Sequence, residues 1–324
     1  MQQFQSRKVV VIGAGSVGAT FCYVLMQTGL ANEIVIIDVD RQRAEGEVMD
    51  LCHGLAFVSP VQIRVGNYHD CADANLILMT AGAKQKQGQS RLDLVRQNTE
   101  IVHNVCDQIS RHTRESVLIM VTNPVDVLAY VALRRLGWPR GRVIGSGTVL
   151  DTSRFRYMLS DHCGLDPRSI HAYILGEHGD SEFAAWSLAR IGGLGIKDYC
   201  GMCEGCEYEG EHRQIEEAVR DSAYHIIDYK GATYWAIGLA LKRIAEAVLR
   251  NEKSVLTVST LLDGEYGIRD ICLSVPCVVG KNGISRVIQA KLSEREQGLL
   301  EKSAGVLKEI LAQADPTLVG AVKI

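Results

Sequence analysis

The chain has 324 residues, of which 47% are hydrophobic and 23% are charged, and its formal net charge at pH 7 is −3. This composition is that of a globular protein and excludes a disordered or fibrous chain, while the length predicts about two domains. The small net charge argues against a nucleic acid as the main partner and favours an enzyme that acts on a small molecule.

The first uncharged stretch, from Val9 to Asn32, has the length of a signal peptide or of a short membrane span. It contains four glycines, however, and its β-branched run from Val9 to Ile12 is typical of a strand. We therefore expect no membrane association and a cytoplasmic protein. In that reducing compartment the 10 cysteines are expected to be mostly small, buried thiols.

Short apolar runs alternate with helical patterns in residues 1–146. Continuously apolar strands are expected where helices cover both faces of a parallel sheet, so this half is predicted to be a doubly wound α/β domain of the Rossmann type. The predicted strands are Lys8–Gly13, Glu33–Asp38, Val61–Gly66, Asn75–Thr80 and Val117–Val121. The predicted helices are Ser16–Gly29, Arg41–Ala56, Ser90–His112 and Pro124–Leu136.

Residues 147–324 show a different pattern and are predicted to form a mixed α+β domain. No internal repeat or low-complexity linker separates the two halves, so we expect them to pack closely. In chain order the predicted elements are a helix over Val149–Cys163, a strand over Ile170–Leu175, a long helical stretch over Glu211–Asn251, strands over Val255–Leu262 and Ile271–Val279, and a final helix that opens at Ser293.

A glycine-rich turn follows the first predicted strand. Gly13, Gly15 and Gly18 form the pattern G-x-G-x-x-G between that strand and a helix, which is the context that dinucleotide binding requires. The three glycines allow, in turn, a tight turn, a close approach of backbone amides to a pyrophosphate, and close packing of the helix on the strand. Asp38 ends the second strand, where its carboxylate can accept both ribose hydroxyls and repel a 2′-phosphate. The sequence therefore predicts NAD rather than NADP.

A histidine near the middle of the chain is a candidate for proton transfer. His178 lies between Gly176 and Gly179 just after a predicted strand, so its imidazole is expected to be accessible. Its candidate partner is Asp151 at a helix start, and Arg154 lies three residues later on the same helix face. A lone loop histidine often has no catalytic role and an Asp at a helix start can be an N-cap, so the pattern alone leaves both interpretations open.

Seven segments carry a resemblance that extends from the first strand to the last: GAGSVG, TAGAKQKQGQSR, TNPVD, VIGSGTVLDTSRFRYML, LGEHGDSE, KGATYWAIG and LSVPCVVGKNGI. In this order they resemble the L-lactate dehydrogenases of the lactate/malate dehydrogenase family. The resemblance implies an NAD-binding Rossmann domain, a catalytic and oligomerisation domain, and reversible hydride transfer between (S)-lactate and NAD in glycolysis or fermentation. The remote alternative is a non-catalytic NAD-binding protein, against which the retained catalytic groups argue.

The resemblance implies a role for each candidate. His178 exchanges the proton of the hydroxyl, for which an imidazole with a pKa of about 6.5 is suited in both directions. Asp151 orients the ring and stabilises its protonated form. Arg154 grips the substrate carboxylate with a planar fork that Lys cannot reproduce. Arg91 ends the polar segment Gly82–Arg91, which in the family closes over bound substrate and brings this arginine to the carbonyl.

Further positions match family contacts. Asn123 matches the residue that hydrogen-bonds the substrate oxygen, and Thr233 and Ile237 match positions beside the substrate and the nicotinamide. The cofactor contacts implied beyond the glycine turn and Asp38 are Val17, Thr80, Gly82, Asn123 and Ile237.

Gln85 matches the loop position that selects the substrate within the family. Malate dehydrogenases carry Arg there, which pairs with the second carboxylate of oxaloacetate. Burying that carboxylate beside the neutral Gln85 would leave a charge unpaired, at a cost on the order of several kcal/mol. We therefore expect lactate and pyruvate as the pair, with a malate or branched 2-hydroxy acid dehydrogenase as the alternative.

Arg156 and His171 match positions at which many bacterial lactate dehydrogenases bind fructose 1,6-bisphosphate at a subunit interface. The resemblance thus implies activation by this bisphosphate in a homotetramer. The alternative is that Arg156 is solvated or makes an ion pair at an interface, and that His171 is an ordinary edge-strand residue. Only seven residues precede Lys8, which favours the bacterial type over enzymes with a long N-terminal arm.

Cys200, Cys203 and Cys206 form a C-x-x-C-x-x-C motif. This spacing is compatible with a metal site or a redox pair. No second cysteine pair follows at a suitable spacing and the family needs no metal here, so we expect a surface loop without a metal.

Overall fold

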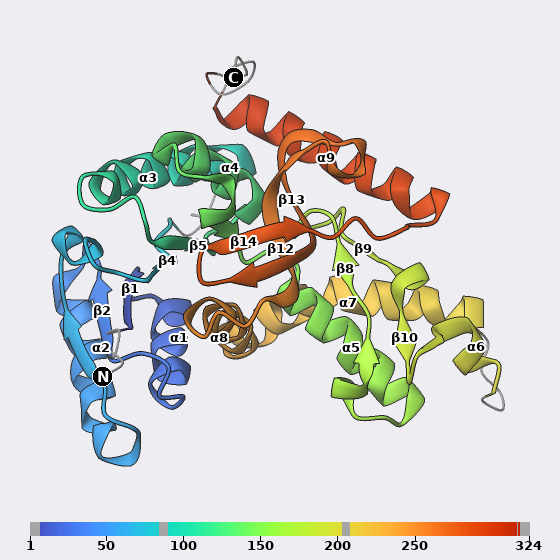
Figure 1. Cartoon of the computed structure of the whole chain (residues 1–324), viewed down its shortest axis with the longest axis horizontal. Coiled ribbons are helices and arrows are strands. Elements are labelled where there is room, and N and C mark those ends of the chain that lie inside the picture. The colour runs from blue at the N-terminus through green and yellow to red at the C-terminus, as the bar shows by residue number, and fades with distance from the viewer. Residues whose placement is uncertain (1–6, 84–89, 203–207, 316, 318–324) are drawn as a thin grey trace.

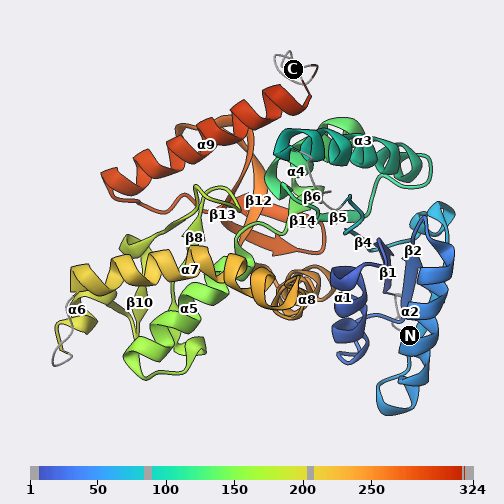
Figure 2. The same ribbon diagram turned by 180° about the vertical axis from the view of Figure 1, so that it is seen from behind.

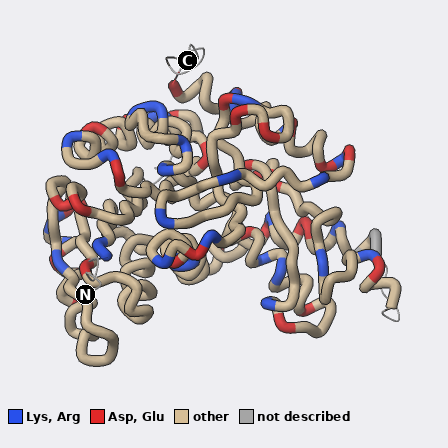
Figure 3. Tube along the Cα trace, in the orientation of Figure 1, with Lys and Arg blue, Asp and Glu red and all other residues tan. Residues whose placement is uncertain are grey.

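The computed structural model describes residues 7–83, 90–202, 208–315 and 317 (Figure 1). Gln85, Cys203 and Cys206, which the sequence singles out, lie outside these residues. Lys and Arg alternate with Asp and Glu along the described chain rather than gathering in one region (Figure 3).

One large sheet forms the centre of the described residues. Its strands, in order across the sheet, are β14 (Gly283–Val287), β13 (Arg269–Gly280), β12 (Ser254–Asp263), β6 (Val143–Gly145), β5 (Val117–Met120), β4 (Leu76–Met79), β1 (Lys8–Ile12), β2 (Glu33–Ile37) and β3 (Gln62–Val65). The strands from β6 to β3 run parallel, in the order of a doubly wound Rossmann sheet. The predicted fold class is confirmed.

Helices cover both faces of the parallel strands. Figures 1 and 2 show α3 (Arg91–Ser110) and α4 (Val125–Leu136) on one face and α1 (Ser16–Met26) and α2 (Arg41–His53) on the other. Because of this double cover every residue of β1, β4 and β5 is buried, which is why their sequences are apolar throughout apart from Lys8 at the start of β1.

An antiparallel hairpin extends this sheet from the second half of the chain. Strand β12 pairs with β6 through Ser259 and Gly145, and a Cβ at Gly145 would lie 2.7 Å from the Ser259 Cβ. The strands β13 and β14 continue beyond it. The sequence analysis missed the short strands β6 and β14, whose few residues carry no strong periodic pattern.

The remaining helices build the second half around the hairpin. They are α5 (Val149–Cys163), α6 (Ile196–Cys200), α7 (Tyr208–Lys230), α8 (Trp235–Leu249) and α9 (Glu294–Ala314). Helix α9 opens as predicted, because Ser293 and Glu296 form a reciprocal capping box. The long helical stretch predicted from Glu211 to Asn251 is two helices, since Gly231 with φ of +81° ends the first.

Short elements connect these helices. The strand predicted over Ile170–Leu175 is two strands in different small sheets, because its first segment pairs with Arg190–Ile191 and its second with Phe183–Ala184. The short strands are β7 (Ile170–His171), β8 (Ile174–Leu175), β9 (Phe183–Ala184), β10 (Arg190–Ile191) and β11 (Leu194–Gly195). Single 3-10 turns lie at Leu55–Phe57, Tyr68–Cys71, Arg140–Arg142, Pro167–Ser169, Trp186–Leu188 and Glu265–Gly267.

Most of the described cysteines contribute to packing. The buried ones are Cys22, Cys71, Cys106, Cys200, Cys272 and Cys277. Burial raises the pKa of Cys22, Cys71 and Cys106 to about 12, so these thiols stay protonated and unreactive. None of the described helices combines the length and apolarity needed to cross a bilayer.

Candidate active site

The glycine turn after β1 has the geometry that dinucleotide binding requires. Gly13 has φ of +112°, and a Cβ there would lie 2.6 Å from the Thr80 Oγ1. A Cβ at Gly18 would lie 2.0 Å from the Gly13 carbonyl oxygen, so only glycine lets α1 pack this closely on the turn. A Cβ at Gly15 would meet no heavy atom within 4 Å, which leaves open space in front of the helix.

This open space fits a pyrophosphate. No side chain caps the N-terminus of α1, so its first amides can donate to an anion. Asp38 lies at the end of β2 beside the turn, where its Oδ2 accepts the Ala14 N–H at 2.6 Å and its Oδ1 accepts the Asp40 N–H at 2.9 Å. A carboxylate has about four acceptor positions, so both oxygens can still accept ribose hydroxyls. The described residues therefore fit a dinucleotide.

The carboxyl ends of β4 and β5 meet beside this turn. Asn98 of α3, which is buried, links the two: its Oδ1 accepts the Ala83 N–H at 2.8 Å and its Nδ2 donates to the Asn123 carbonyl at 3.0 Å. The Asn123–Pro124 peptide bond is cis. Asn98 was missed by the sequence analysis because nothing near it in the chain indicates partners 15 and 25 residues away.

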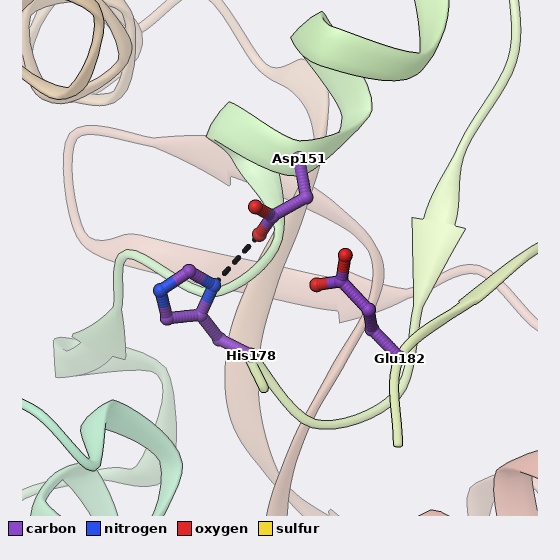
Figure 4. A group of neighbouring side chains, drawn as sticks. All are labelled: Asp151, His178 and Glu182. Carbon is purple, nitrogen blue, oxygen red and sulfur yellow. Dashed lines mark hydrogen bonds and ion pairs between the residues drawn. The ribbon is translucent and has the colours of Figure 1, made fainter. Parts of the chain in front are cut away.

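The structure brings His178, Asp151 and Arg154 together. The Nδ1 of His178 lies 2.7 Å from the Oδ2 of Asp151 (Figure 4). The other carboxylate oxygen, Oδ1, accepts from the Arg154 Nη1 at 2.7 Å. The Asp151 side chain is 1% exposed, whereas that of His178 is 26% exposed. The buried Asp151 carboxylate thus holds two side chains, those of His178 and Arg154, that are more exposed than itself.

This arrangement favours the charged forms of His178 and Asp151. Burial disfavours the imidazolium, but the neighbouring Asp151 carboxylate outweighs it and raises the pKa of His178 to about 9. Burial likewise opposes ionisation of Asp151, yet His178 and then Arg154 lower the pKa of this carboxyl. At neutral pH the site therefore holds a protonated imidazole against a carboxylate.

Glu182 is a further acid that the sequence analysis missed. It is 8% exposed, and its carboxyl lies on the Asp151 side of the imidazole rather than on the Nε2 side (Figure 4). Burial and the charge of Asp151 raise the pKa of Glu182 well above its usual value. The sequence feature that could have identified Glu182 is its position four residues after His178, in the segment LGEHGDSE.

The three groups could also offer ligands to a cation. One ligand atom from each of Asp151, His178 and Glu182 lies within 4.8 Å of the others. The Arg154 guanidinium already occupies one Asp151 oxygen, and the His178 Nδ1 is bonded to the other. The arrangement therefore suits acid–base chemistry better than a metal.

A cavity of about 440 Å³ opens beside His178 and is of ordinary size for a small-molecule site. Asn123, Arg154 and Glu182 line it with the imidazole. Its apolar walls come from α3, α7 and α9 and include Leu92, Val95, Ile227 and Ile310. Arg154 and His178 together with these apolar walls suit a small acid with an apolar remainder.

Thr233 and Ile237 are not among the described residues that line this cavity. Thr233 lies between α7 and α8, and Ile237 in α8 packs against the main hydrophobic core. The backbone of Arg91 begins α3.

Arg156 lies on α5 but does not line the cavity. Its Nε donates to the Ala172 carbonyl at 3.0 Å, and its guanidinium lies 5.4 Å from the centroid of the Tyr173 ring. Burial lowers its pKa, and no carboxylate of the described chain forms an ion pair with it. His171 is exposed in β7. An ion pair of Arg156 across a subunit interface stays a prediction, because it would need a second chain.

Comparisons with known proteins agree with this geometry. Residues 7–145 match the profile of the lactate/malate dehydrogenase NAD-binding domain, and residues 148–316 match that of the lactate/malate dehydrogenase alpha/beta C-terminal domain. The chain is 52% identical to an L-lactate dehydrogenase of Acetivibrio thermocellus and 53% identical to one of Treponema denticola, in each case over 95% of this chain and 98% of the relative.

A solved structure is similar over the same length. The ligands-bound form of the minor L-lactate dehydrogenase from Enterococcus mundtii superposes with a TM-score of 0.93 at 42% identity, covering 96% of this chain and 99% of that one. The chain therefore belongs to the lactate/malate dehydrogenase family and is an NAD-dependent oxidoreductase.

Proposed function

We propose that the protein is an L-lactate dehydrogenase, which transfers a hydride reversibly between (S)-lactate and NAD to give pyruvate and NADH. The observation that carries the proposal is the single Asp151 carboxylate, which holds His178 on one oxygen and Arg154 on the other. A proton carrier and a carboxylate anchor at this spacing suit a 2-hydroxy acid, whose hydroxyl and carboxylate are on adjacent carbons. The names of the relatives support lactate as that acid.

In the proposed reaction the Nε2 of His178 exchanges the proton, because its Nδ1 is engaged by Asp151. The neutral imidazole takes the hydroxyl proton when lactate is oxidised, and the imidazolium, the form favoured at neutral pH, returns it to the carbonyl oxygen when pyruvate is reduced. Bound NAD supplies the hydride acceptor. Arg154 holds the carboxylate and Asp151 stabilises the charged ring, while Arg91 and Asn123 polarise the reacting oxygen.

The cofactor-contacting residues are part of the same proposal. Open space before α1 and the carboxylate at the end of β2 support it. The residues proposed to contact the cofactor are Gly13, Gly15, Val17, Gly18, Asp38, Thr80, Gly82, Asn123 and Ile237. Thr233 is assigned to the substrate. We also propose that the chain divides into an NAD-binding domain over 1–146 and a catalytic domain over 147–324.

Gln85 is proposed to select pyruvate over oxaloacetate, because it offers no charge to a second carboxylate. The decisive assay is NADH oxidation with pyruvate, oxaloacetate and a branched 2-oxo acid. Pyruvate should give the highest kcat/KM. A higher value with oxaloacetate would replace the proposal by malate dehydrogenase activity, and one with the branched acid by the corresponding dehydrogenase.

A homotetramer activated by fructose 1,6-bisphosphate is proposed as the regulated form, in the cytoplasm. Support comes from Arg156, a half-buried cation with no carboxylate partner in the described chain, which a phosphoryl group would satisfy. Adding the bisphosphate should lower the KM for pyruvate and increase the tetramer fraction in sedimentation. Unchanged kinetics and assembly would reject this part of the proposal.

A further inference from the structure

A second buried carboxylate holds the loop that carries His178. Asp126 is the second residue of α4, three residues after Asn123, and is 1% exposed. Its Oδ2 accepts the backbone N–H of His178 at 2.8 Å, and its Oδ1 lies 3.4 Å from the Ser274 Oγ of β13. The loop is therefore joined directly to the turn that carries Asn123.

The flanks of the same loop are held separately by α9. The Ser303 Oγ accepts the Glu177 N–H at 2.7 Å and lies 2.9 Å from the Ser181 Oγ. These bonds fix the residues before and after His178, whereas Asp126 holds the backbone of His178 itself. The separation between the imidazole and Asn123 thus depends on Asp126.

We propose that Asp126 is a positioning residue for proton transfer, which fixes His178 relative to Asn123 and whose negative charge favours the protonated imidazole. The inference rests on the proposed function and deepens it. Asp151 acts on the ring of His178, and Asp126 acts on its backbone from the opposite half of the fold.

The surroundings of Asp126 support this role. His178 and Glu177 face it from the loop, and Cys272 faces it from β13. Burial raises the pKa of Asp126 to about 6, although the His178 N–H and imidazole favour its ionised form. Asp126 is therefore charged at neutral pH, and its charge contributes to the raised pKa of His178.

Two substitutions separate the hydrogen bond from the charge. Asp126→Asn keeps an oxygen for the His178 N–H but removes the charge, while Asp126→Leu removes both and keeps the branched shape of the side chain. We expect Asp126→Leu to lower kcat for pyruvate reduction by about tenfold or more, because misplacement of a proton carrier slows chemistry. Asp126→Asn should keep kcat at pH 7 within about threefold of the wild type. It should also move the midpoint of the pH profile of kcat/KM for lactate to lower pH, because the imidazole loses a neighbouring negative charge.

Asp270 offers a matched control at the other end of α4. Its carboxylate accepts from the Tyr130 hydroxyl at 2.7 Å and pairs with Arg134, both on α4. Asp270→Asn should lower Tm through weaker helix packing but leave kcat and the pH midpoint as in the wild type.

The outcomes distinguish the two levels of the proposal. A wild-type protein that does not reduce pyruvate would overturn the proposed function. An active wild type together with a fully active Asp126→Leu, or with an unchanged pH midpoint in Asp126→Asn, would overturn the positioning role. If circular dichroism shows that Asp126→Leu is unfolded, the pH midpoint of Asp126→Asn decides alone.

Discussion

Arg154 lies one helical turn after Asp151 in α5, and its Nη1 donates to the Asp151 Oδ1 at 2.7 Å. The other oxygen of this carboxylate holds His178. One carboxylate on α5 therefore links the proposed substrate anchor, on the same helix, to the proposed proton carrier, on the loop after β8. A change to any of the three groups is expected to disturb the other two.

Replacing Arg154 tests the anchor. Arg154→Lys is expected to raise the KM for pyruvate and to lower kcat/KM by about 100-fold, because an ammonium cannot form two parallel hydrogen bonds to a carboxylate. Steady-state NADH oxidation measures the loss, and NADH affinity from fluorescence quenching should stay unchanged. A loss below about threefold would be inconsistent with a bidentate role.

Replacing Asp151 tests the support of the imidazole. Asp151→Asn is expected to lower kcat on the order of 10³-fold or more, because the ring loses its orientation and its stabilising charge. The pKa of His178 should fall from about 9, so the midpoint of the pH profile for lactate oxidation should move to lower pH. An unshifted profile would argue against His178 as the titrating group.

The His178–Asp151 pair is also expected to affect stability. The pKa of His178 is about 9 in the fold and about 6.5 in the unfolded chain, so its contribution to the free energy of unfolding is complete below pH 6.5. That contribution, at most on the order of 3 kcal/mol, is lost as the pH rises through 9. Urea unfolding of the wild type and of Asp151→Asn across this window measures it. Parallel curves for the two proteins would contradict the assignment.

Two glycines of the turn are expected to respond differently to the same change. Gly18→Ala places a Cβ 2.0 Å from the Gly13 carbonyl oxygen, so it should cost about 1–3 kcal/mol of stability. Gly15→Ala meets no protein atom, so Tm should hold while NADH affinity falls, because the methyl group enters the space proposed for the pyrophosphate. Thermal melts and NADH titrations separate the two effects, and equal losses of Tm would refute this division.

The sequence predicts well those helices and strands that are marked by a few neighbouring residues. The β-branched run of β1 identifies one strand, and Ser293 identifies one helix start, almost to the residue. Helix α5 matches its predicted bounds. The break at Gly231 was missed because a single glycine inside a helical pattern is a weak signal, and only the positive φ in the fold makes it decisive.

The proposed active site was predictable only in part. His178, Asp151 and Arg154 lie in segments that resemble a known family, and the structure brings them into contact. Asp126 and Ser303 could not be recognised as neighbours of the His178 loop, since the hydrogen bonds that place them there span 52 and 126 residues. Such contacts depend on tertiary packing, which no short window of sequence records.

The pairing of Ser259 with Gly145 also restricts the movements open to the molecule. Because β12 hydrogen-bonds to β6, the central sheet passes without interruption from one half of the chain to the other. Opening the two halves about a hinge would break this ladder and expose a bare sheet edge on each side. Substrate binding is thus expected to involve local rearrangement beside the central sheet rather than a hinge motion between the two halves. The whole chain is expected to unfold as one cooperative unit.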